Sequence, residues 1–496
     1  MSGGDEEWAA AAAEEETMLS PAARLFQSPK FNCHIVTIIG CKTTFDPEVI
    51  KAGLAQTLLK HPRFSSKLVV NDNIFRRRRW VRTPVKLDEH VFVPSFDSKP
   101  ENPDQFLEDY VSHLTTTPID LSKPLWELHL LNLRTSDAES VGIFRIHHSV
   151  GDGASLMSLL LACTRQTSDP EKVPTLPAPL KRSAETEYSR GCGGQLLWVL
   201  ATIWSAITLI WNTLVDIIMF IATILFLKDT KTPIKGSKGV EMNTKRFVHR
   251  TISLDHIKLV KNATNTTIND VLLGVTQAGL SRYLNRRYGL SAKDKGTKEK
   301  TNYLPKHIRL SATILVNLRP TIGIEALADM MAKNSKTKWG NWIGYLLLPF
   351  NIALQDDPLD YVRQAKAIVD RKKHSFEAIC TYFCAQLLLK ILGAELTAAT
   401  ARRAISSTTL AFSNLIGPLE EVSFYGHQIA YLAPSVYGHP HALTIHFQSY
   451  VDKMTIVLAV DPNVIPDPQQ LFDDLEESLQ LIREAILQQR MNKEIV

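Results

Sequence analysis

The chain contains few cysteines, and their arrangement does not indicate any chemistry. Six cysteines are spread over 496 residues, and no two of them form a CxxC pair. Cys380 and Cys384 are one helical turn apart, a spacing equally compatible with two buried small side chains. A disulfide framework is therefore excluded, and neither a redox centre nor a zinc site is supported. We expect no metal and a reducing compartment.

Three other signals are missing. Residues 1 to about 17 are acidic and rich in alanine, without the basic start and apolar core of a secretory signal, so they predict a disordered or frayed tail. No GxSxG motif or convincing Cys–His arrangement indicates a nucleophilic mechanism. The net charge of +5 is modest against 56 basic and 51 acidic residues, so charge alone does not indicate a nucleic-acid partner.

Length and composition favour a globular protein with two domains. The chain is 45% hydrophobic and 22% charged, which is typical of folded proteins with sizeable cores. A proline-rich stretch, Asp169–Pro179, predicts a linker, and the composition then changes abruptly to apolar. These changes divide the chain into a tail at 1–19, a first domain at 20–180, an apolar insert at 181–240 and a second domain at 241–490.

The most informative stretch is RIHHSVGDG at residues 145–153. Apolar residues over Val141–Ile146 predict a buried strand, and Ala154–Cys163 predicts a helix. Two adjacent histidines, His147 and His148, therefore lie where a strand opens into a turn made possible by two glycines. A side chain at such a place can face a cleft.

Histidines at strand ends are usually structural, but the residue pattern here favours chemistry. Neutral imidazole suits general-base catalysis near pH 7. Asp152 follows His148 by four residues, and a carboxylate at a tight turn can hold the local geometry through charge-assisted hydrogen bonds. The sequence HHSVGDG resembles the HHxxxDG signature of the CoA-dependent acyltransferase superfamily. This superfamily includes chloramphenicol acetyltransferase, carnitine acyltransferases, peptide-synthetase condensation domains and the wax ester synthase/diacylglycerol acyltransferases.

A run of arginines occupies Arg76–Arg82. Strand-like flanks on both sides predict a hairpin whose tip and return strand carry these arginines. A solvated loop is the simplest interpretation. The functional interpretations are attraction to anionic lipid headgroups or to the phosphates of a nucleotide-bearing substrate. Nucleic acid is the weakest, because no further basic patch or binding motif accompanies the run.

The central insert contains a long apolar segment. Leu196–Val215 carries no charge and, after Asp216, the apolar run continues to Leu227, which is long enough to cross a bilayer as one helix. Its polar residues, however, share an arc of roughly 120° on a helical wheel, which a lone lipid-immersed helix does not need. The stripe therefore favours a helix at a membrane interface or one packed on protein along one side. Its members are Thr202, Ser205, Thr208, Asn212, Asp216 and Thr223.

The second half contains further short motifs. In TINDV, a threonine or asparagine can cap the helix that follows, so Asn269 and Asp270 are first-turn residues that complement the helix dipole. A strand over 308–318 ends in the sequence NLRP, which contains Asn317 and Arg319. Ala442–Tyr450 and Met454–Val460 predict a hairpin, and Gln469–Leu487 predicts an amphipathic closing helix.

Together these motifs resemble the wax ester synthase/diacylglycerol acyltransferase family, and most closely its plant type, over nearly the whole chain. In that family an Asn–Asp pair is a recognised second motif. The resemblance implies an α/β fold with two chloramphenicol-acetyltransferase-like domains, each a mixed sheet flanked by helices, plus a hydrophobic membrane-associated helical insert. The matching stretches are HHSVGDG, Pro124–Glu127 (PLWE), Thr267–Val271 (TINDV), Asn317–Pro320 (NLRP) and Ser413–Pro418 (SNLIGP).

The resemblance also implies an activity: transfer of a fatty acyl group from acyl-CoA to a long-chain fatty alcohol or to diacylglycerol. Acyl-CoA is then a co-substrate, and no cofactor is expected. His148 would be the general base, His147 would support the strand end or the imidazole, and Asp152 would hold the motif's shape with an arginine as its partner. The other implied positions are Gly153, Asn269 and Asp270, which support the motifs, and Asn317 and Arg319, which contact substrate.

The apolar segment constrains the topology. If both halves build one site they must lie on the same side of a membrane, so we favour an embedded or interfacial helix that returns to its own side. We expect the cytosolic face of the endoplasmic reticulum, with the plasma membrane as an alternative. The sequons at Asn262 and Asn265 would then remain unglycosylated.

Two other functions are compatible with the sequence. One is an acyltransferase for a smaller, soluble alcohol, which the long apolar insert disfavours. The other is a non-enzymatic membrane-associated protein that keeps the fold. The intact HHSVGDG argues against it, because a scaffold does not need both histidines and the aspartate.

Overall fold

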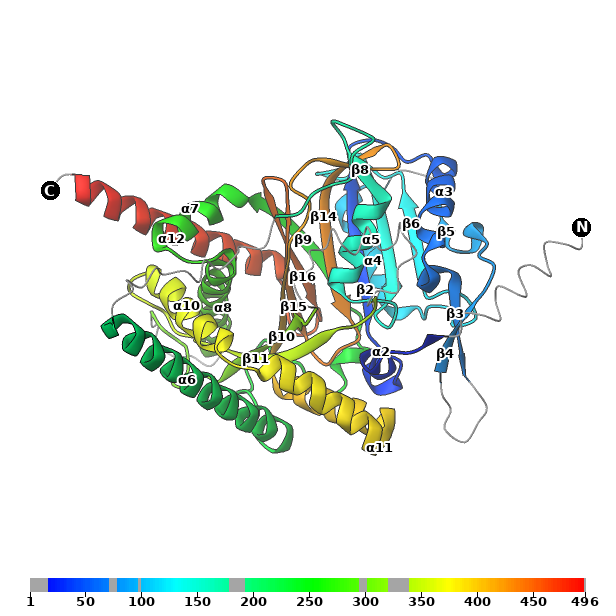
Figure 1. Cartoon of the computed structure of the whole chain (residues 1–496). Coiled ribbons are helices and arrows are strands. Elements are labelled where there is room, and N and C mark those ends of the chain that lie inside the picture. Colours follow the sequence, from blue (N-terminus) through cyan, green and yellow to red (C-terminus); the bar gives the residue numbers. More distant parts are fainter. Residues whose placement is uncertain are drawn as a thin grey trace, which may run out of the picture.

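The computed structural model describes residues 17–70, 78–96, 100–177, 192–293, 301–319 and 339–494. Two mixed sheets lie side by side, each covered by helices, with a small three-stranded sheet at one edge (Figure 1). This is the α/β architecture that the sequence resemblance implied, so the fold class is confirmed.

The first sheet has seven strands, and it carries the histidine motif. Among its strand pairs in the described residues, only β5–β6 is parallel. Helices α3 (Pro47–Gln56), α4 (Pro103–Thr116) and α5 (Gly153–Cys163) accompany this sheet. The strand order is β5 (Val91–Phe92), β6 (Trp126–Leu131), β7 (Ser140–His147), β2 (His34–Cys41), β14 (His427–Tyr437), β13 (Val422–Phe424) and β8 (Thr164–Gln166).

The second sheet has six strands and a large apolar core. Strands β10, β12 and β15 run parallel to one another, and the predicted β15–β16 hairpin is confirmed. Helices α7 (Leu254–Thr264), α8 (Ile268–Lys293), α10 (Leu359–Lys373) and α12 (Pro468–Glu494) bury their apolar faces in this core. The strand order is β11 (Ile343–Phe350), β10 (Leu310–Asn317), β12 (Leu410–Leu415), β15 (Leu443–Tyr450), β16 (Lys453–Val460) and β9 (Arg246–Ser253).

The two sheets are connected both by the path of the chain and by a common buried core. Strands β13 and β14 come from the second half of the sequence, yet they complete the sheet of the first half, with β14 antiparallel to β2. A buried cluster joins the sheets, with Val36 and Ile38 of β2 packing in the same cluster as Val457 of β16. The expected domain boundaries at 180 and 240 remain predictions. The two halves of the sequence are nevertheless interlocked, because β13 and β14 of the second half complete the sheet of the first.

The arginine-rich segment returns as a strand of the small sheet. β4 (Arg78–Arg82) pairs with β3 (Ser66–Val70) and with β1 (Thr17–Met18), which confirms the hairpin; its tip at 71–77 lies outside the described residues. Arg78 donates a hydrogen bond to the backbone carbonyl of Gln27 at 2.5 Å. Leu19 is buried in the first core, and residues 1–16 of the expected tail lie outside the described residues.

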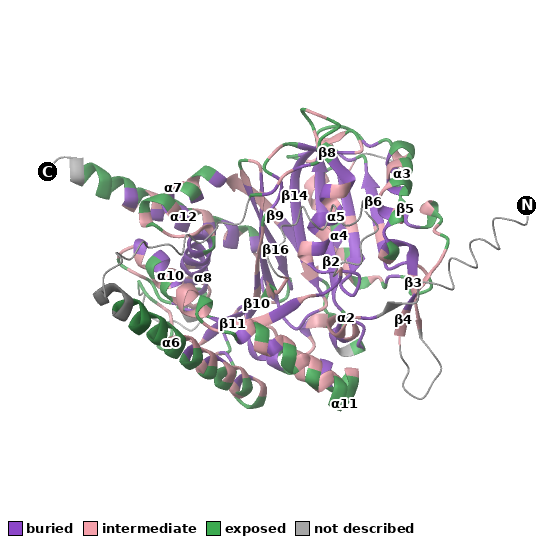
Figure 2. Cartoon of the chain, in the orientation of Figure 1, coloured by how far each residue is buried: buried purple, intermediate pink, exposed green. Residues whose placement is uncertain are grey.

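The apolar insert forms one long helix, α6 (Cys192–Leu225), which lies lengthwise along one face with many exposed side chains (Figure 2). The predicted polar stripe is confirmed where Asn212, Asp216 and Thr223 are buried against protein. Thr202 and Ser205 are exposed, because no described segment covers the first half of the helix, so for them packing on protein is not observed and the membrane-interface alternative remains a prediction. By length and composition α6 could cross a membrane, and so could α11 (Glu377–Ser407), which the sequence did not predict.

One local interpretation is wrong. Cys380 and Cys384 are not two buried small residues, since Cys384 is exposed and Cys380 only half-buried on α11. Elsewhere, helix α3 ends at Gln56 and is followed by a short 3₁₀ turn before His61–Pro62. Helix α8 extends to Lys293.

Candidate active site

The histidine motif forms the strand, turn and helix that its sequence predicts. β7 ends at His147, and Asp152 caps α5 by accepting a hydrogen bond from the Ser155 amide at 3.0 Å. Neither motif glycine has a positive φ. Both glycines are closely packed instead: a Cβ on Gly151 would lie 3.3 Å from the Trp339 ring and one on Gly153 would lie 3.2 Å from Leu415, so these neighbours would have to shift by a few tenths of an ångström.

The surroundings of His148 fix its tautomer. Asn341 donates from Nδ2 to the His148 backbone carbonyl at 2.9 Å, so its Oδ1, 3.1 Å from His148 Nδ1, must be an acceptor. The imidazole proton therefore resides on Nδ1, and Nε2 keeps its lone pair. The Phe26 ring stacks on the imidazole with a centroid distance of 4.1 Å. This arrangement leaves Nε2 as the ring atom that can accept a proton.

Burial also keeps His148 uncharged. Desolvation lowers its pKa, and the opposing effects of its own backbone carbonyl, the Asp152 charge and Asn341 offset only part of this. The imidazole is therefore neutral at pH 7 and can accept a proton.

His147 has a different role, because both of its ring nitrogens are occupied. Nδ1 accepts hydrogen bonds from the Ser149 amide and from Gln27 Nε2, both at 3.1 Å, so the proton lies on Nε2 and is donated to Asn32 Oδ1 at 2.8 Å. Burial holds the pKa of His147 well below its usual value. These contacts tie the end of β7 to the chain just before β2.

Asp152 and Arg319 form a buried ion pair with Nη1 and Oδ2 2.8 Å apart, and their side chains are 2% and 8% exposed. The carboxylate also accepts the Trp342 amide at 3.0 Å, while Arg319 reaches Ser155 Oγ and the Gly340 carbonyl. The pair thus ties the HHSVGDG turn to the Gly340–Trp342 segment, as the expected arginine partner would. The guanidinium of Arg319 is engaged here, and a direct substrate contact for it remains a prediction.

The remaining predicted residues separate into two kinds. Asp270 and Thr267 exchange reciprocal hydrogen bonds that cap α8, so Asp270 has a structural part in the described contacts. Asn269 and Asn317 are exposed residues in the wall of the central cavity. Asn269 accepts a hydrogen bond from Asn414 at 2.6 Å, and Asn317 accepts one from the Arg319 amide at 3.1 Å.

A cavity of about 760 Å³ lies against His148 between the two sheets. Its wall is mainly apolar and comes from α2 (Pro21–Phe26), α5, β10, β11, β12, β14 and the α10–α11 junction. A smaller apolar cavity of about 80 Å³ lies between the first sheet and α5, and the two share Ile35, Gly153, Met157, Leu415 and Pro434 as lining. The site can therefore hold a long apolar substrate beside a neutral imidazole.

Several residues of this site were not predicted. Asn341 and Phe26 contact His148 from distant segments, and no local pattern in the sequence links either residue to His148. His446 also lines the cavity, with Nδ1 3.2 Å from Ser435 Oγ, and burial with the nearby His148 lowers its pKa to about 4. Within the described chain, no cluster of three His, Cys, Asp or Glu side chains could hold a metal ion.

Replacing Asn341 with leucine should lower kcat by about 10–100-fold and leave KM nearly unchanged, since an imidazole without its orienting partner loses tautomer and direction. Asn341→Asp retains an acceptor for Nδ1–H and should keep more activity. Its carboxylate should also raise the pKa of His148 and move the acid limb of the pH–rate profile to higher pH. Steady-state kinetics across pH check this. Equal losses in both variants, with no shift of the profile, would show that Asn341 is merely structural.

Solved structures with similar folds are acyl-transferring and condensing proteins. One is the wax ester synthase/diacylglycerol acyltransferase from Marinobacter aquaeolei VT8, with a TM-score of 0.56, 18% identity, and coverage of 95% of this chain and 99% of that one. Another is the first condensation domain of the CDA synthetase, with a TM-score of 0.55, 11% identity, and coverage of 96% and 97%. The chain therefore shares the two-sheet fold of these structures.

Sequence comparisons define the family within that class. Residues 40–272 match the model of the wax ester synthase/diacylglycerol acyltransferase catalytic domain, and residues 339–483 match the WS/DGAT C-terminal domain. Wax ester synthase/diacylglycerol acyltransferase 5 of Arabidopsis thaliana is 56% identical over 488 residues, covering 96% of this chain and 95% of that protein. Wax ester synthase/diacylglycerol acyltransferase 6 of the same plant is 54% identical over 488 residues, covering 95% of this chain and 94% of that protein. The chain belongs to the wax ester synthase/diacylglycerol acyltransferase family of acyltransferases.

Proposed function

We propose that the protein transfers a fatty acyl group from acyl-CoA to a long-chain alcohol, forming a wax ester, and to diacylglycerol, forming triacylglycerol. The observation that carries this proposal is a neutral His148 in the wall of a large and mainly apolar cavity. Asn341 contacts the imidazole at Nδ1, so the lone pair on Nε2 is not used by Asn341. The names of the Arabidopsis relatives support the same pair of acceptors.

The proposed reaction needs one general base and no acyl-enzyme. His148 Nε2 removes the hydroxyl proton as the alcohol oxygen attacks the thioester carbonyl and forms the new C–O bond. The tetrahedral intermediate then collapses, the C–S bond breaks, and the departing CoA sulfur takes the proton from the imidazolium. The base is regenerated, and the products are an ester and CoA thiol. Asn341 keeps Nδ1 protonated throughout, so Nε2 remains the atom that exchanges the proton.

The shape and polarity of the site favour long apolar acceptors over the alternative of a smaller, soluble alcohol. The wall beyond His148 is formed mainly by aliphatic side chains, and the adjoining small cavity is also apolar. Burying an alkyl chain there gains about 0.8 kcal/mol per methylene group. The chain-length preference and the balance between the two products depend on which acceptor fills this space better.

A competition assay tests the proposal. Protein in detergent micelles receives palmitoyl-CoA with equal concentrations of hexadecanol, diacylglycerol and a short soluble alcohol, and the products are separated by thin-layer chromatography. We expect hexadecanol and diacylglycerol esters to dominate. Dominance of the short ester would support the soluble-alcohol alternative, and the absence of all three would support a non-catalytic role.

We also propose that the protein works at the endoplasmic reticulum membrane, with its catalytic domains on the cytosolic face where acyl-CoA is available. Two long apolar helices, α6 and α11, support an association with membrane lipid. Asn262, an exposed residue of α7, and Asn265, at its end, then remain without glycan. A mobility shift of the expressed protein on treatment with an endoglycosidase would contradict this topology.

A further inference from the structure

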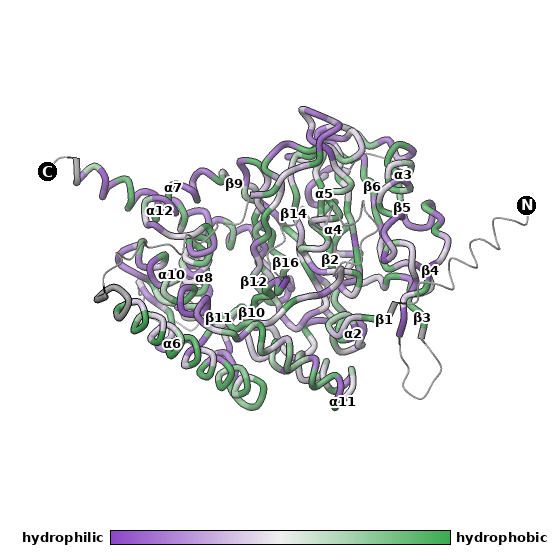
Figure 3. Tube along the Cα trace, viewed as in Figure 1, coloured by the Kyte–Doolittle hydropathy of each residue, from purple (hydrophilic) through white to green (hydrophobic). Residues whose placement is uncertain are grey.

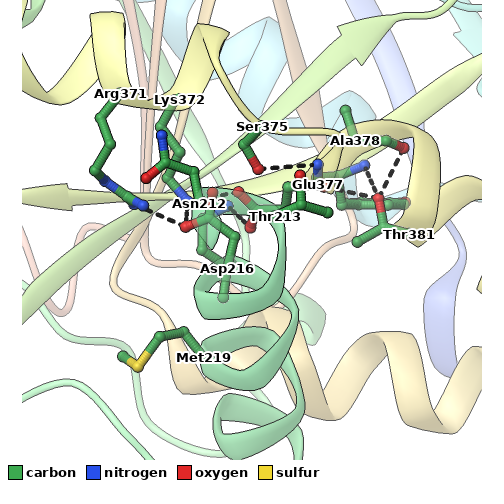
Figure 4. Close-up of polar contacts among 12 residues, drawn as sticks. Asn212, Thr213, Asp216, Met219, Arg371, Lys372, Ser375, Glu377, Ala378 and Thr381 are labelled. Atoms are coloured by element: carbon green, nitrogen blue, oxygen red, sulfur yellow. Dashed lines mark hydrogen bonds and ion pairs between the residues drawn. The ribbon is translucent and has the colours of Figure 1, made fainter. Parts of the chain in front are cut away.

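Polar side chains of α6, among them Asn212 and Asp216 of its polar stripe, hold the helix against the α10–α11 junction (Figure 4). Asn212 donates to the His374 carbonyl at 3.1 Å, and Thr213 Oγ1 accepts the Phe376 amide at 3.0 Å. Asp216, 1% exposed, is paired with Arg371 at 2.7 Å and with Lys372 at 2.9 Å. The single charge within the apolar stretch of α6 is therefore neutralised by protein.

Lys372 extends this fastening into the second sheet. Its ammonium group bridges Asp216 and Glu377, and Glu377 also accepts the Leu347 amide of β11 at 3.0 Å. All three side chains are 7% exposed or less. We call Asp216, Lys372 and Glu377 the clamp. Removing one member would leave a buried charge without its partner, so the clamp holds α6 along this face.

The other apolar helix, α11, is a hairpin and not a straight rod. Gly393 interrupts it with φ 76° and ψ 178°. Its two ends meet on neighbouring strands: Glu377 bonds to Leu347, Leu347 pairs with Thr313, and Thr313 Oγ1 lies 2.9 Å from Thr408 Oγ1. A straight helix of this length would separate its ends by roughly 45 Å. The arms, 377–392 and 394–407, are each shorter than the roughly 20 residues needed to cross a bilayer.

Both helices present apolar side chains to the outside. More than half of the exposed large apolar residues in the described chain belong to α6 and α11, and Figure 3 shows both helices as largely hydrophobic. The exposed residues include Trp198, Trp204 and Trp211 of α6, and indole side chains favour the interface between lipid and water. Lys228 and Lys231 follow α6 and Lys390 lies near the α11 tip, where cations can meet anionic headgroups. The chemistry of this surface fits a lipid bilayer.

This surface is continuous with the substrate cavity. Lys372, Lys373, Ser375, Ala378 and Ile379 of the α10–α11 junction line the cavity that contains His148. Lys373 and Ile379 are also exposed, so the same junction lines the cavity and forms part of the outer surface.

On the inner side of the hairpin, Ala398 and Ile405 pack in the same cluster as Phe26, the residue that stacks on His148. Contacts therefore connect the apolar surface with the catalytic imidazole.

We propose that α6 and the α11 hairpin form one surface that docks on a single leaflet of a bilayer, and that a lipid-soluble acceptor passes from that leaflet into the cavity at the α10–α11 junction. The clamp fixes α6 beside this entrance. Neither helix crosses the membrane: α11 reverses at Gly393, and α6 lies along the face to which the clamp holds it. The inference rests on the proposed function for the identity of the acceptor, and on the structure alone for the docking surface.

Vesicle binding and kinetics test the docking surface. The triple variant Trp204→Ser, Leu387→Ser and Ile391→Ser removes exposed apolar side chains from both helices; its control, Leu121→Ser, Val173→Ser and Leu290→Ser, removes exposed ones elsewhere. We expect the first to lose about tenfold or more of its binding to phosphatidylcholine–phosphatidylserine vesicles. Its KM for vesicle-borne hexadecanol should rise, while its kinetics with a soluble alcohol match wild type. The control should bind and react as wild type.

Labelling tests the single-leaflet arrangement. Val173→Cys and Lys228→Cys lie on either side of α6, in a background with Cys192, Cys380 and Cys384 replaced by serine. A membrane-impermeant maleimide added outside sealed vesicles should label both positions. Labelling of only one would show that α6 crosses the bilayer and overturn the inference. Asp216→Asn should accelerate amide hydrogen exchange along α6 if the clamp holds it.

The outcomes separate this inference from the proposed function. If wild type in detergent micelles fails to acylate hexadecanol, the proposed function fails, whereas vesicle binding and labelling still decide the docking surface. If wild type is active but the surface triple variant keeps its KM for vesicle-borne hexadecanol, the entrance is wrong. Dimerisation through this surface that vesicles cannot displace would identify a second copy of the chain as its occupant and overturn the inference.

Discussion

Replacing His148 with alanine is expected to lower kcat for acyl transfer by about 10²–10⁴-fold, the usual contribution of a positioned general base. No other side chain among the described residues that line the cavity combines a neutral imidazole with the Asn341 contact that fixes its tautomer. The loss should appear in kcat more than in KM, since the imidazole acts as the alcohol attacks. Initial rates of palmitoyl-hexadecanol formation measure it, with His256→Ala on α7 as a histidine control. A His148→Ala variant with near-normal activity would refute the mechanism while leaving the family unchanged.

The pH dependence follows from the direction of the pKa shift. Burial lowers the pKa of His148 below 6.5, so the imidazole is already in its basic form at neutral pH. The acid limb of the pH–rate profile should therefore have its midpoint below 6.5, and the rate should decrease as pH falls through that midpoint and the imidazole takes up a proton. A midpoint above 6.5 for the acid limb would contradict this environment for the base.

Breaking the Asp152–Arg319 pair is expected to destabilise the fold strongly. Arg319→Met leaves the Asp152 carboxylate buried without its cation, and the free energy of unfolding should fall by about 3–5 kcal/mol. Asp152→Asn alone should also destabilise the fold, because the buried guanidinium of Arg319 then lacks its carboxylate partner. The double variant should be less destabilised than the sum of the two, with a coupling free energy of about 0.5–3 kcal/mol.

Denaturation in detergent, followed by tryptophan fluorescence, measures these free energies. The pair ties the HHSVGDG turn to the segment that carries Asn341, so the variants should lose activity even under conditions in which they remain folded. The control is Arg363→Met, which breaks exposed pairs with Asp357 and Asp360 and should change stability by no more than about 1 kcal/mol. Additive losses from Arg319→Met and Asp152→Asn would show that the two side chains do not act as a unit.

Local sequence patterns predicted the strand, turn and helix around His148 because their periodicity and caps lie within about twenty consecutive residues. The β15–β16 hairpin was predictable for the same reason. Contacts between distant segments were not: Asn341 lies 193 residues from His148 in sequence, and no local pattern shows that they meet. The hairpin of α11 also escaped prediction, since Lys390 and Glu395 interrupt its apolar run near the turn at Gly393.

The polar stripe of α6 shows the limit of a helical-wheel pattern: it predicts which side of the helix is polar, but not which of the polar residues are buried. A helical wheel places Thr202 and Asp216 on the same side, but it cannot show how far a partner extends along the helix. The α10–α11 junction reaches only the second half, so Asp216 is buried and Thr202 is exposed. Only the position of the partner distinguishes these two residues.

The position of β14, a strand of the second half, in the first sheet has a consequence for biosynthesis. β2 pairs on one side with β7 and on the other with β14, and its partner Tyr437 follows His34 by about 400 residues. Until the ribosome has released β14, β2 is an open edge strand whose backbone groups can pair with another chain. The nascent protein must therefore pass through a long period in which its first sheet is incomplete, and a chaperone that shields such an edge would determine how much of it reaches the native state.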